Sequence, residues 1–87
     1  MSIFSSKSDS GGVINLILPT KFGERLKQLR EEANLTMEQL AVSLGTKKQT
    51  ISRYEKNQRE PEYATLIKIA QFFNVSTDYL LGLKDYK

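Results

Sequence analysis

The residues best suited to chemistry are five lysines and arginines gathered near the middle of the chain. Residues 47–59 hold these five cations against a single carboxylate, Glu55. Lysine and arginine donate hydrogen bonds to O6 and N7 of guanine, and glutamine pairs with N6 and N7 of adenine. This combination of residue types therefore suits the binding of a nucleic acid.

The spacing places these side chains on one surface of a short helix. Ile51 and Tyr54 are one helical turn apart and predict the inward side, so the outward side carries Lys48, Gln49, Thr50, Ser52 and Arg53. A short helix held against another by a tight turn has the geometry that enters the major groove of DNA. A polar helix that only solvates a small bundle has a similar composition, so charge alone leaves both interpretations open.

The composition excludes several other functions. The 87 residues can form only one small core, and 13 Lys+Arg against 10 Asp+Glu give a net charge of +3. There is no cysteine and no histidine, which excludes disulfides, thiolate and imidazole catalysis, and metal sites built on these residues. No glycine-rich phosphate loop is present either. We therefore expect no enzyme activity, no metal and no cofactor.

Apolar periodicity, together with residues typical of helix starts and ends, predicts about five short helices. These helices position the basic segment. A first amphipathic helix has its apolar residues at Phe22, Leu26, Leu29 and Ala33. Thr36 and Gln39 form a capping box that opens a second helix, which ends at Gly45. The third helix runs from about residue 48 to 56, and Asn57, which tolerates the left-handed conformation, follows it.

The C-terminal part of the chain predicts two further helices. Pro61 starts a segment in which the predicted inward residues are Tyr63, Leu66, Ile67, Ala70 and Phe73. Ser76 is the predicted N-cap of a last turn or two that carries Tyr79, Leu80 and Leu81 and ends at Gly82. The predicted fold class is thus all-α.

The first 19 residues differ in composition from the rest. Residues 1–12 are rich in serine and glycine and predict a flexible tail, whereas the next six are mostly apolar and predict a short β-strand or extended arm, namely Val13, Ile14, Asn15, Leu16, Ile17 and Leu18. This apolar run belongs to the flexible tail, covers a patch on its own domain, or pairs with a second copy in a dimer, and the last two are favoured. It is too short for a membrane helix or a secretory signal, so we expect a cytoplasmic protein without membrane contact.

Several fragments, in this order and spacing, resemble the lambda-repressor/Cro-type helix-turn-helix family, also called XRE. They are Leu35-Thr36-x-Glu38-Gln39-Leu40-Ala41, Leu44-Gly45, Thr50-Ile51-Ser52-Arg53-Tyr54-Glu55, Arg59-Glu60-Pro61, Thr65-Leu66-x-Lys68-Ile69-Ala70 and Asn74-Val75-Ser76-Thr77-Asp78-Tyr79-Leu80-Leu81-Gly82. The resemblance implies a five-helix, lambda-repressor-like DNA-binding domain over residues 20–83, between an N-terminal extension (1–19) and a C-terminal tail (84–87).

The resemblance also implies a function and a set of contacts. The expected partner is double-stranded DNA with a pseudo-palindromic operator, read by a homodimer that acts as a repressor and is nucleoid-associated when bound. The implied base contacts are Lys48, Gln49, Thr50, Ser52 and Arg53. The implied phosphate contacts are Lys47, Lys56, Asn57, Gln58 and Arg59. The alternative is a protein-interaction module, such as an antitoxin or anti-repressor with a regulatory protein partner and secondary DNA binding.

Three further roles follow from the resemblance and from departures from the family pattern. Arg30 and Glu55 occupy positions that form a structural ion pair in relatives, whereas Arg25 and Lys27 are expected to be solvated surface charges. Met37 replaces a common glutamine and is expected to pack. Lys47 stands at the usual Ser/Thr cap of the third helix, so Thr46 is expected to cap it or Lys47 to serve a phosphate.

Overall fold

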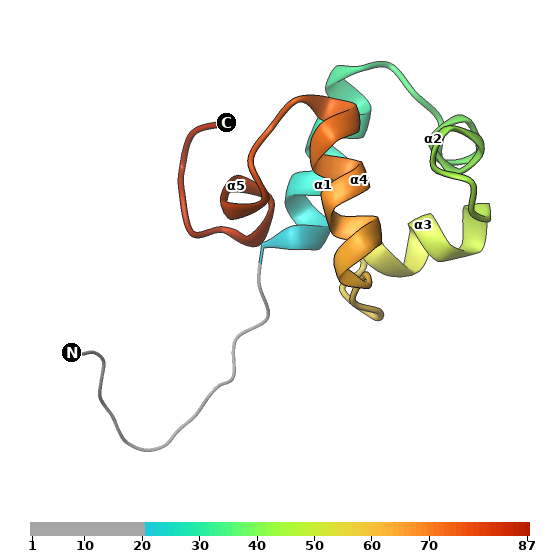
Figure 1. The fold of residues 1–87 in the computed structure, drawn as a ribbon. Helices are drawn as coiled ribbons and strands as arrows, with labels where there is room; N and C mark the ends of the chain where they lie inside the picture. Colours follow the sequence, from blue (N-terminus) through green and yellow to red (C-terminus); the bar gives the residue numbers. More distant parts are fainter. Residues whose placement is uncertain (1–20) are drawn as a thin grey trace.

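The computed structural model describes residues 21–87, which form five α-helices and no strand (Figure 1). The helices are α1 (Phe22–Glu32), α2 (Met37–Leu44), α3 (Lys48–Glu55), α4 (Tyr63–Phe73) and α5 (Thr77–Leu81). The all-α prediction is therefore confirmed for this part of the chain. The predicted arm or strand at Val13–Leu18 lies outside the described residues.

Local capping signals set the helix ends where the sequence predicted them. The Thr36 hydroxyl accepts from the backbone N–H of Gln39, and the Gln39 side chain accepts from the N–H of Thr36, so the capping box of α2 is complete. Ser76 accepts from the N–H of Tyr79 at the start of α5. Gly45, which follows α2, has the predicted left-handed conformation, with φ of 71°.

The start of α3 differs from the expectation that Thr46 caps it. Lys47 is the N-cap residue, and no side chain accepts a capping hydrogen bond at this end. Thr46 instead uses its backbone N–H to bond the carbonyl of Ala41, because it belongs to the turn that closes α2. The first N–H groups of α3 therefore lack a side-chain cap.

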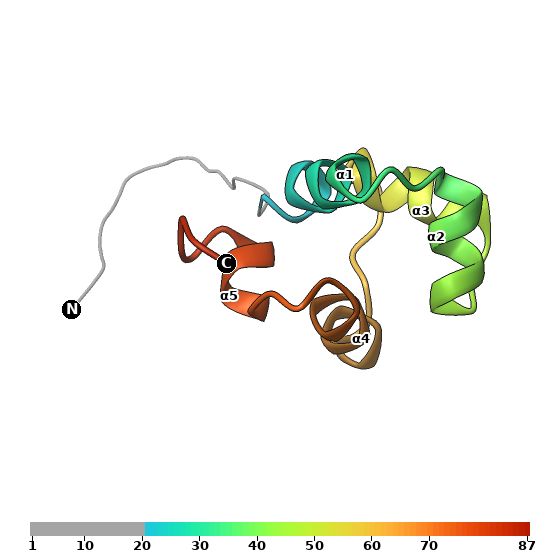
Figure 2. The same ribbon diagram turned by 90° about the horizontal axis from the view of Figure 1, so that it is seen from above.

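Each helix places one large apolar side chain in the centre of the domain. These fully buried residues are Leu26, Leu40, Ile51, Ile69 and Leu80. Figure 2 shows α3 lying beside both α1 and α2, while α4 and α5 close the other side of the bundle. Since all five helices share one core, the orientation of α3 depends on the packing of the whole domain.

The inward face of α4 and the end of α1 differ from the prediction. Tyr63 is 86% exposed and Ile67 50% exposed, whereas Ile69 and Ala70 are buried and Leu66 and Phe73 are partly buried against the core. The packed stripe of α4 thus follows the spacing i, i+3, i+4, i+7 from Leu66, with Tyr63 and Ile67 beside it. Ala33 is exposed because α1 ends one residue before it.

Residues 21–87 hold no helix long and apolar enough to cross a membrane. Within the same range, histidine, cysteine, aspartate and glutamate form no cluster of three that could hold a metal ion.

Candidate nucleic-acid interface

The buried side of α3 fixes which of its side chains face outward. Ile51 and Tyr54 are buried as predicted, and the ring of Tyr54 meets that of Phe22 edge to face, with centroids 5.7 Å apart. The opposite side of the helix carries the exposed Lys48, Gln49 and Arg53. The helical period thus separates an apolar anchoring side from a polar, cationic side.

Two adjoining hollows lie along this outward side. One, of about 450 Å³, is lined by Met37, Lys48, Gln49, Ser52, Arg53, Lys56 and Gln58. The other, of about 300 Å³, is lined by Lys47, Gln49, Thr50 and Arg53. The two hollows together include every residue predicted to contact bases, and none of the described residues that line them is acidic. We name this surface the α3 face.

An ion pair between α1 and α3 holds the back of this helix. Arg30 Nε lies 2.6 Å from Glu55 Oε2, and a second guanidinium nitrogen donates to Oε1 at 3.1 Å. Arg30 also donates to the carbonyl oxygen of Leu35 at 2.8 Å. The hydrogen bond to Glu55 raises the pKa of the Arg30 guanidinium. Glu55, the single acid of the basic segment, is therefore neutralised by Arg30 and does not oppose the cations of the α3 face.

The two predicted phosphate contacts nearest α4 lie away from the two hollows. Asn57 has φ of 57°, and its side-chain oxygen accepts from the backbone N–H of Gly23 at 3.0 Å, in the first turn of α1. Arg59 lies in the loop that follows and borders a different recess, next to Pro61. The structure thus brings Lys47, Lys56 and Gln58 to the α3 face but places Asn57 and Arg59 beside it.

Gly23 allows α1 to approach the end of α3. A Cβ atom at this position would lie 2.6 Å from the carbonyl oxygen of Tyr54 and 2.7 Å from that of Glu55, closer than packed atoms tolerate. This contact is not predictable from the sequence, because a glycine inside a helical pattern gives no indication of which backbone will pack against it.

Arg25 was expected to be a solvated surface charge, and the structure contradicts this. Its side chain is 12% exposed and donates to the carbonyl oxygens of Tyr79 and Lys84, both at 3.0 Å. The guanidinium also lies 4.1 Å from the centroid of the Tyr79 ring. Arg25 is largely covered because the chain after α5 folds back over α1.

Two side chains brace α2 beside α3. Met37 is partly buried and packs against the core, as expected for a methionine at this position, while it also lines the larger hollow. Lys68 of α4 donates to the carbonyl oxygen of Leu44, the last residue of α2, at 2.9 Å. A cation at a helix C-terminus also complements the helix dipole. The role of Lys68 was not predicted from the sequence, because its partner lies 24 residues away along the chain.

Comparison with known proteins agrees with this geometry. The sequence profile of the helix-turn-helix family matches residues 26–80. The HTH-type transcriptional regulator ImmR of Bacillus subtilis is 43% identical over 60 residues, which are 69% of this chain and 47% of ImmR. The chain spans about half the length of the first curated relatives it matches.

Solved structures of DNA complexes share the fold. The P22 c2 repressor in complex with a synthetic operator has a TM-score of 0.67 and 29% identity, covering 70% of this chain and 94% of that one. The biofilm regulator SinR in complex with DNA has a TM-score of 0.63 and 33% identity, covering 69% and 97%. The curated relatives are named as HTH-type transcriptional regulators, and such regulators are not enzymes. The chain belongs to the lambda-repressor-like, XRE-type helix-turn-helix family of DNA-binding transcriptional regulators.

Proposed function

We propose that this protein reads a specific double-stranded DNA sequence by placing α3 in the major groove. The observation that carries the proposal is the α3 face, where Lys48, Gln49 and Arg53 are exposed. None of the described residues that line its two hollows is acidic. Arginine and lysine favour guanine, and glutamine favours adenine, so the proposed site contains both kinds of base.

The cations that border these three residues would bind the phosphates on either side. Lys47 and Lys56 lie at the two ends of α3, so they can reach the backbone while the middle of the helix faces the bases. Gln58 lines the larger hollow and can donate to the same backbone. Asn57 and Arg59 remain proposed phosphate contacts at the border of the α3 face. For Asn57 the donor would be its side-chain nitrogen, since its oxygen accepts from Gly23.

We further propose that the protein binds as a homodimer and represses transcription. A single α3 helix contacts only a few base pairs, so a second copy related by two-fold symmetry would extend the site to a pseudo-palindrome. The P22 c2 repressor, bound to a synthetic operator, supports this mode by its shared fold. A dimer bound across a promoter would block access of RNA polymerase.

Selection of bound sequences from random double-stranded DNA tests the proposal. We expect an enriched motif with two inverted half-sites whose centres lie about 10 base pairs, or a multiple of that, apart. The absence of enrichment would contradict sequence-specific reading, and enrichment of a single unpaired half-site would contradict the dimer. Transcription in vitro from a promoter that overlaps the motif should fall when the protein is added; a rise would indicate an activator.

A further inference from the structure

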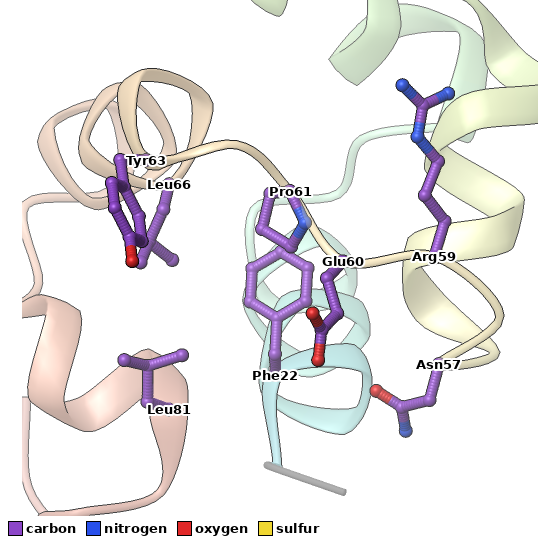
Figure 3. Close-up of a pocket in the computed structure, with 8 residues that line it drawn as sticks. All are labelled: Phe22, Asn57, Arg59, Glu60, Pro61, Tyr63, Leu66 and Leu81. Atoms are coloured by element: carbon purple, nitrogen blue, oxygen red, sulfur yellow. The ribbon is translucent and has the colours of Figure 1, made fainter.

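A recess separate from the α3 face lies between the start of α1, the loop before α4, and helices α4 and α5 (Figure 3). Its volume is about 210 Å³. Five of its eight lining residues are apolar side chains or proline, with Phe22 and Pro61 on one side and Tyr63, Leu66 and Leu81 on the other, and the polar residues Asn57, Arg59 and Glu60 complete the lining on the side of Phe22. We call it the α4–α5 recess. In Figure 3 the guanidinium of Arg59 points away from these apolar side chains.

The apolar surface continues from the recess along α4. Tyr63 and Ile67 are four residues apart on α4, and Leu66 lies directly before Ile67 in the chain. The sequence predicted both Tyr63 and Ile67 to be inward, whereas the structure leaves them exposed. Scattered exposed apolar residues are ordinary in soluble proteins. Here they adjoin a hollow with apolar walls, which is the arrangement of a binding surface.

The chain enters the described domain at the border of this recess. Lys21 directly precedes Phe22, which forms part of the wall. The side chain of Lys21 lies against Gly82, which follows Leu81 of the opposite wall; a Cβ atom on Gly82 would be 3.0 Å from Lys21 Cγ. The described chain therefore begins at the border of the recess.

We propose that the segment Val13–Leu18 docks in the α4–α5 recess of its own domain. In an extended segment alternate side chains point to the same side, so Ile14, Leu16 and Leu18 form one wholly apolar side, and Asn15 lies on the other. Leu18 is four residues from Phe22, a connection that spans at most about 14 Å. The apolar side of the segment can therefore reach the recess.

The size of the recess and the tether favour the protein's own segment over a second copy. A cavity of roughly 150 Å³ holds a benzene-sized group, so about 210 Å³ suits one or two aliphatic side chains. A stable dimer interface buries about 800 Å² on each partner, far more than a recess of this size supplies. A short tether also gives the segment an effective concentration in the millimolar range, above that of free protein.

A pair of full-length variants with the same added charge tests the docking. Leu16→Asp places a carboxylate on the apolar side, whereas Asn15→Asp places one on the opposite side. We expect Leu16→Asp to lower the Tm by about 4–8 °C, the scale of a modest loss of stability in a domain of this size, and to shift the backbone amide NMR signals of Leu66 and Leu81. Asn15→Asp should leave both measurements close to those of the original protein. Equal behaviour of the two variants would overturn the proposal.

Chemical cross-linking then identifies the occupant. Because the chain has no cysteine, Asn15→Cys combined with Tyr63→Cys creates a single reactive pair that leaves the apolar side of the segment intact. The matched control combines Asn15→Cys with Val42→Cys, an exposed site on α2 outside the recess. With a short bismaleimide we expect the first pair to link within one chain and the control not to link. Linkage between two chains, equal linkage in both pairs, or no linkage would overturn the proposal.

Discussion

Arg30 and Glu55 form two parallel hydrogen bonds that join α1 to the C-terminal end of α3. The side chains are 11% and 3% exposed, so the pair is largely removed from water. Two parallel bonds fix the angle between the groups as well as their distance. The pair therefore ties the orientation of the α3 face to the body of the domain.

The first prediction concerns this pair. Arg30→Met leaves the buried Glu55 carboxylate without its cation and should reduce the free energy of unfolding by about 3–5 kcal/mol. The double variant Arg30→Met/Glu55→Gln removes the uncompensated charge and should recover part of that loss. Urea unfolding of Arg30→Met, Glu55→Gln and the double variant measures the coupling free energy between the two side chains. Single-variant losses under about 0.5 kcal/mol would show that the pair contributes little to stability.

The second prediction concerns Gly23. In an open helix, replacing glycine by alanine would stabilise the protein by up to about 1 kcal/mol. At this position the added methyl group would meet the carbonyl oxygens of Tyr54 and Glu55, so Gly23→Ala should destabilise the domain by about 1–3 kcal/mol. Thermal unfolding, with Glu31→Ala on the exposed side of α1 as the control, measures the effect. A higher Tm for Gly23→Ala would disprove the close approach of α1 to α3.

The third prediction concerns Arg25, whose planar guanidinium bonds two carbonyl oxygens and stacks on Tyr79. Lysine keeps the charge but cannot reproduce this geometry. We therefore expect Arg25→Lys to lower the free energy of unfolding by about 1–2 kcal/mol. Lys27→Arg, an exposed site on the same helix, is the control and should be neutral within 0.5 kcal/mol. Equal stability of Arg25→Lys and the original protein would argue against a role for these contacts.

The fourth prediction concerns DNA recognition by the α3 face. Arg53→Ala and Gln49→Ala should each weaken binding to the selected site by about 1–3 kcal/mol while changing binding to random DNA much less. Fluorescence anisotropy at fixed salt measures both. Lys84→Ala, which removes one positive charge beyond α5, controls for the change in net charge. Equal losses on specific and random DNA would refute base reading by these residues.

The salt dependence of DNA binding by a Lys56 variant separately tests the proposed phosphate contact of this residue. If it binds a phosphate, Lys56→Ala should reduce the slope of log K against log salt by about 0.9 and weaken binding similarly on all sequences. An unchanged slope would remove Lys56 from the proposed phosphate contacts.

The fifth prediction concerns pH. The Lys87 ammonium lies 3.0 Å from Glu32 and, together with Gln28, lowers the pKa of this carboxyl from its ordinary value of 4.5. A lowered pKa stabilises the fold above the ordinary value, and this contribution is lost as the pH falls through the folded-state pKa. Glu32 raises the pKa of Lys87 from 10.5, so that contribution is present below 10.5 and is lost as the pH rises through the raised value.

NMR titration of the Glu32 side-chain carbon measures this coupling. Lys87→Met should move the pKa of Glu32 upward, toward 4.5, whereas Lys27→Met should leave it unchanged. The pair is exposed, so salt should weaken the shift. A pKa of Glu32 that does not respond to Lys87→Met would show that the C-terminal residue does not hold this contact in solution.

Features that depend on neighbouring residues in the chain were predictable. The Thr36–Gln39 capping box, the left-handed Gly45 and the Ser76 cap each act within one helical turn. Ile51 and Tyr54 were correctly predicted to be buried because α3 has one short apolar stripe. These interactions form between residues that are close in the sequence, so they do not depend on how the rest of the chain packs.

The face of α4 was predicted only in part because its sequence offers two overlapping apolar stripes. One includes Tyr63 and Ile67, and the other includes Ile69. Both satisfy the helical period, so propensity and spacing do not choose between them. The choice follows from how α4 meets the rest of the core, which buries Ile69 completely.

The sequence by itself determined the number and class of the helices, most of their ends, the concentration of positive charge around α3, and the family. Only the tertiary structure decided that Arg25 is largely covered and that the Asn57 side chain accepts a hydrogen bond from Gly23 in the first turn of α1. It also decided that Gly23 lets α1 approach the end of α3 and that a mostly apolar recess lies beside Phe22. The physical reason is distance along the chain. Capping and periodicity act over a few residues, whereas each of these contacts joins segments more than 30 residues apart, whose meeting depends on the packing of all five described helices around one core.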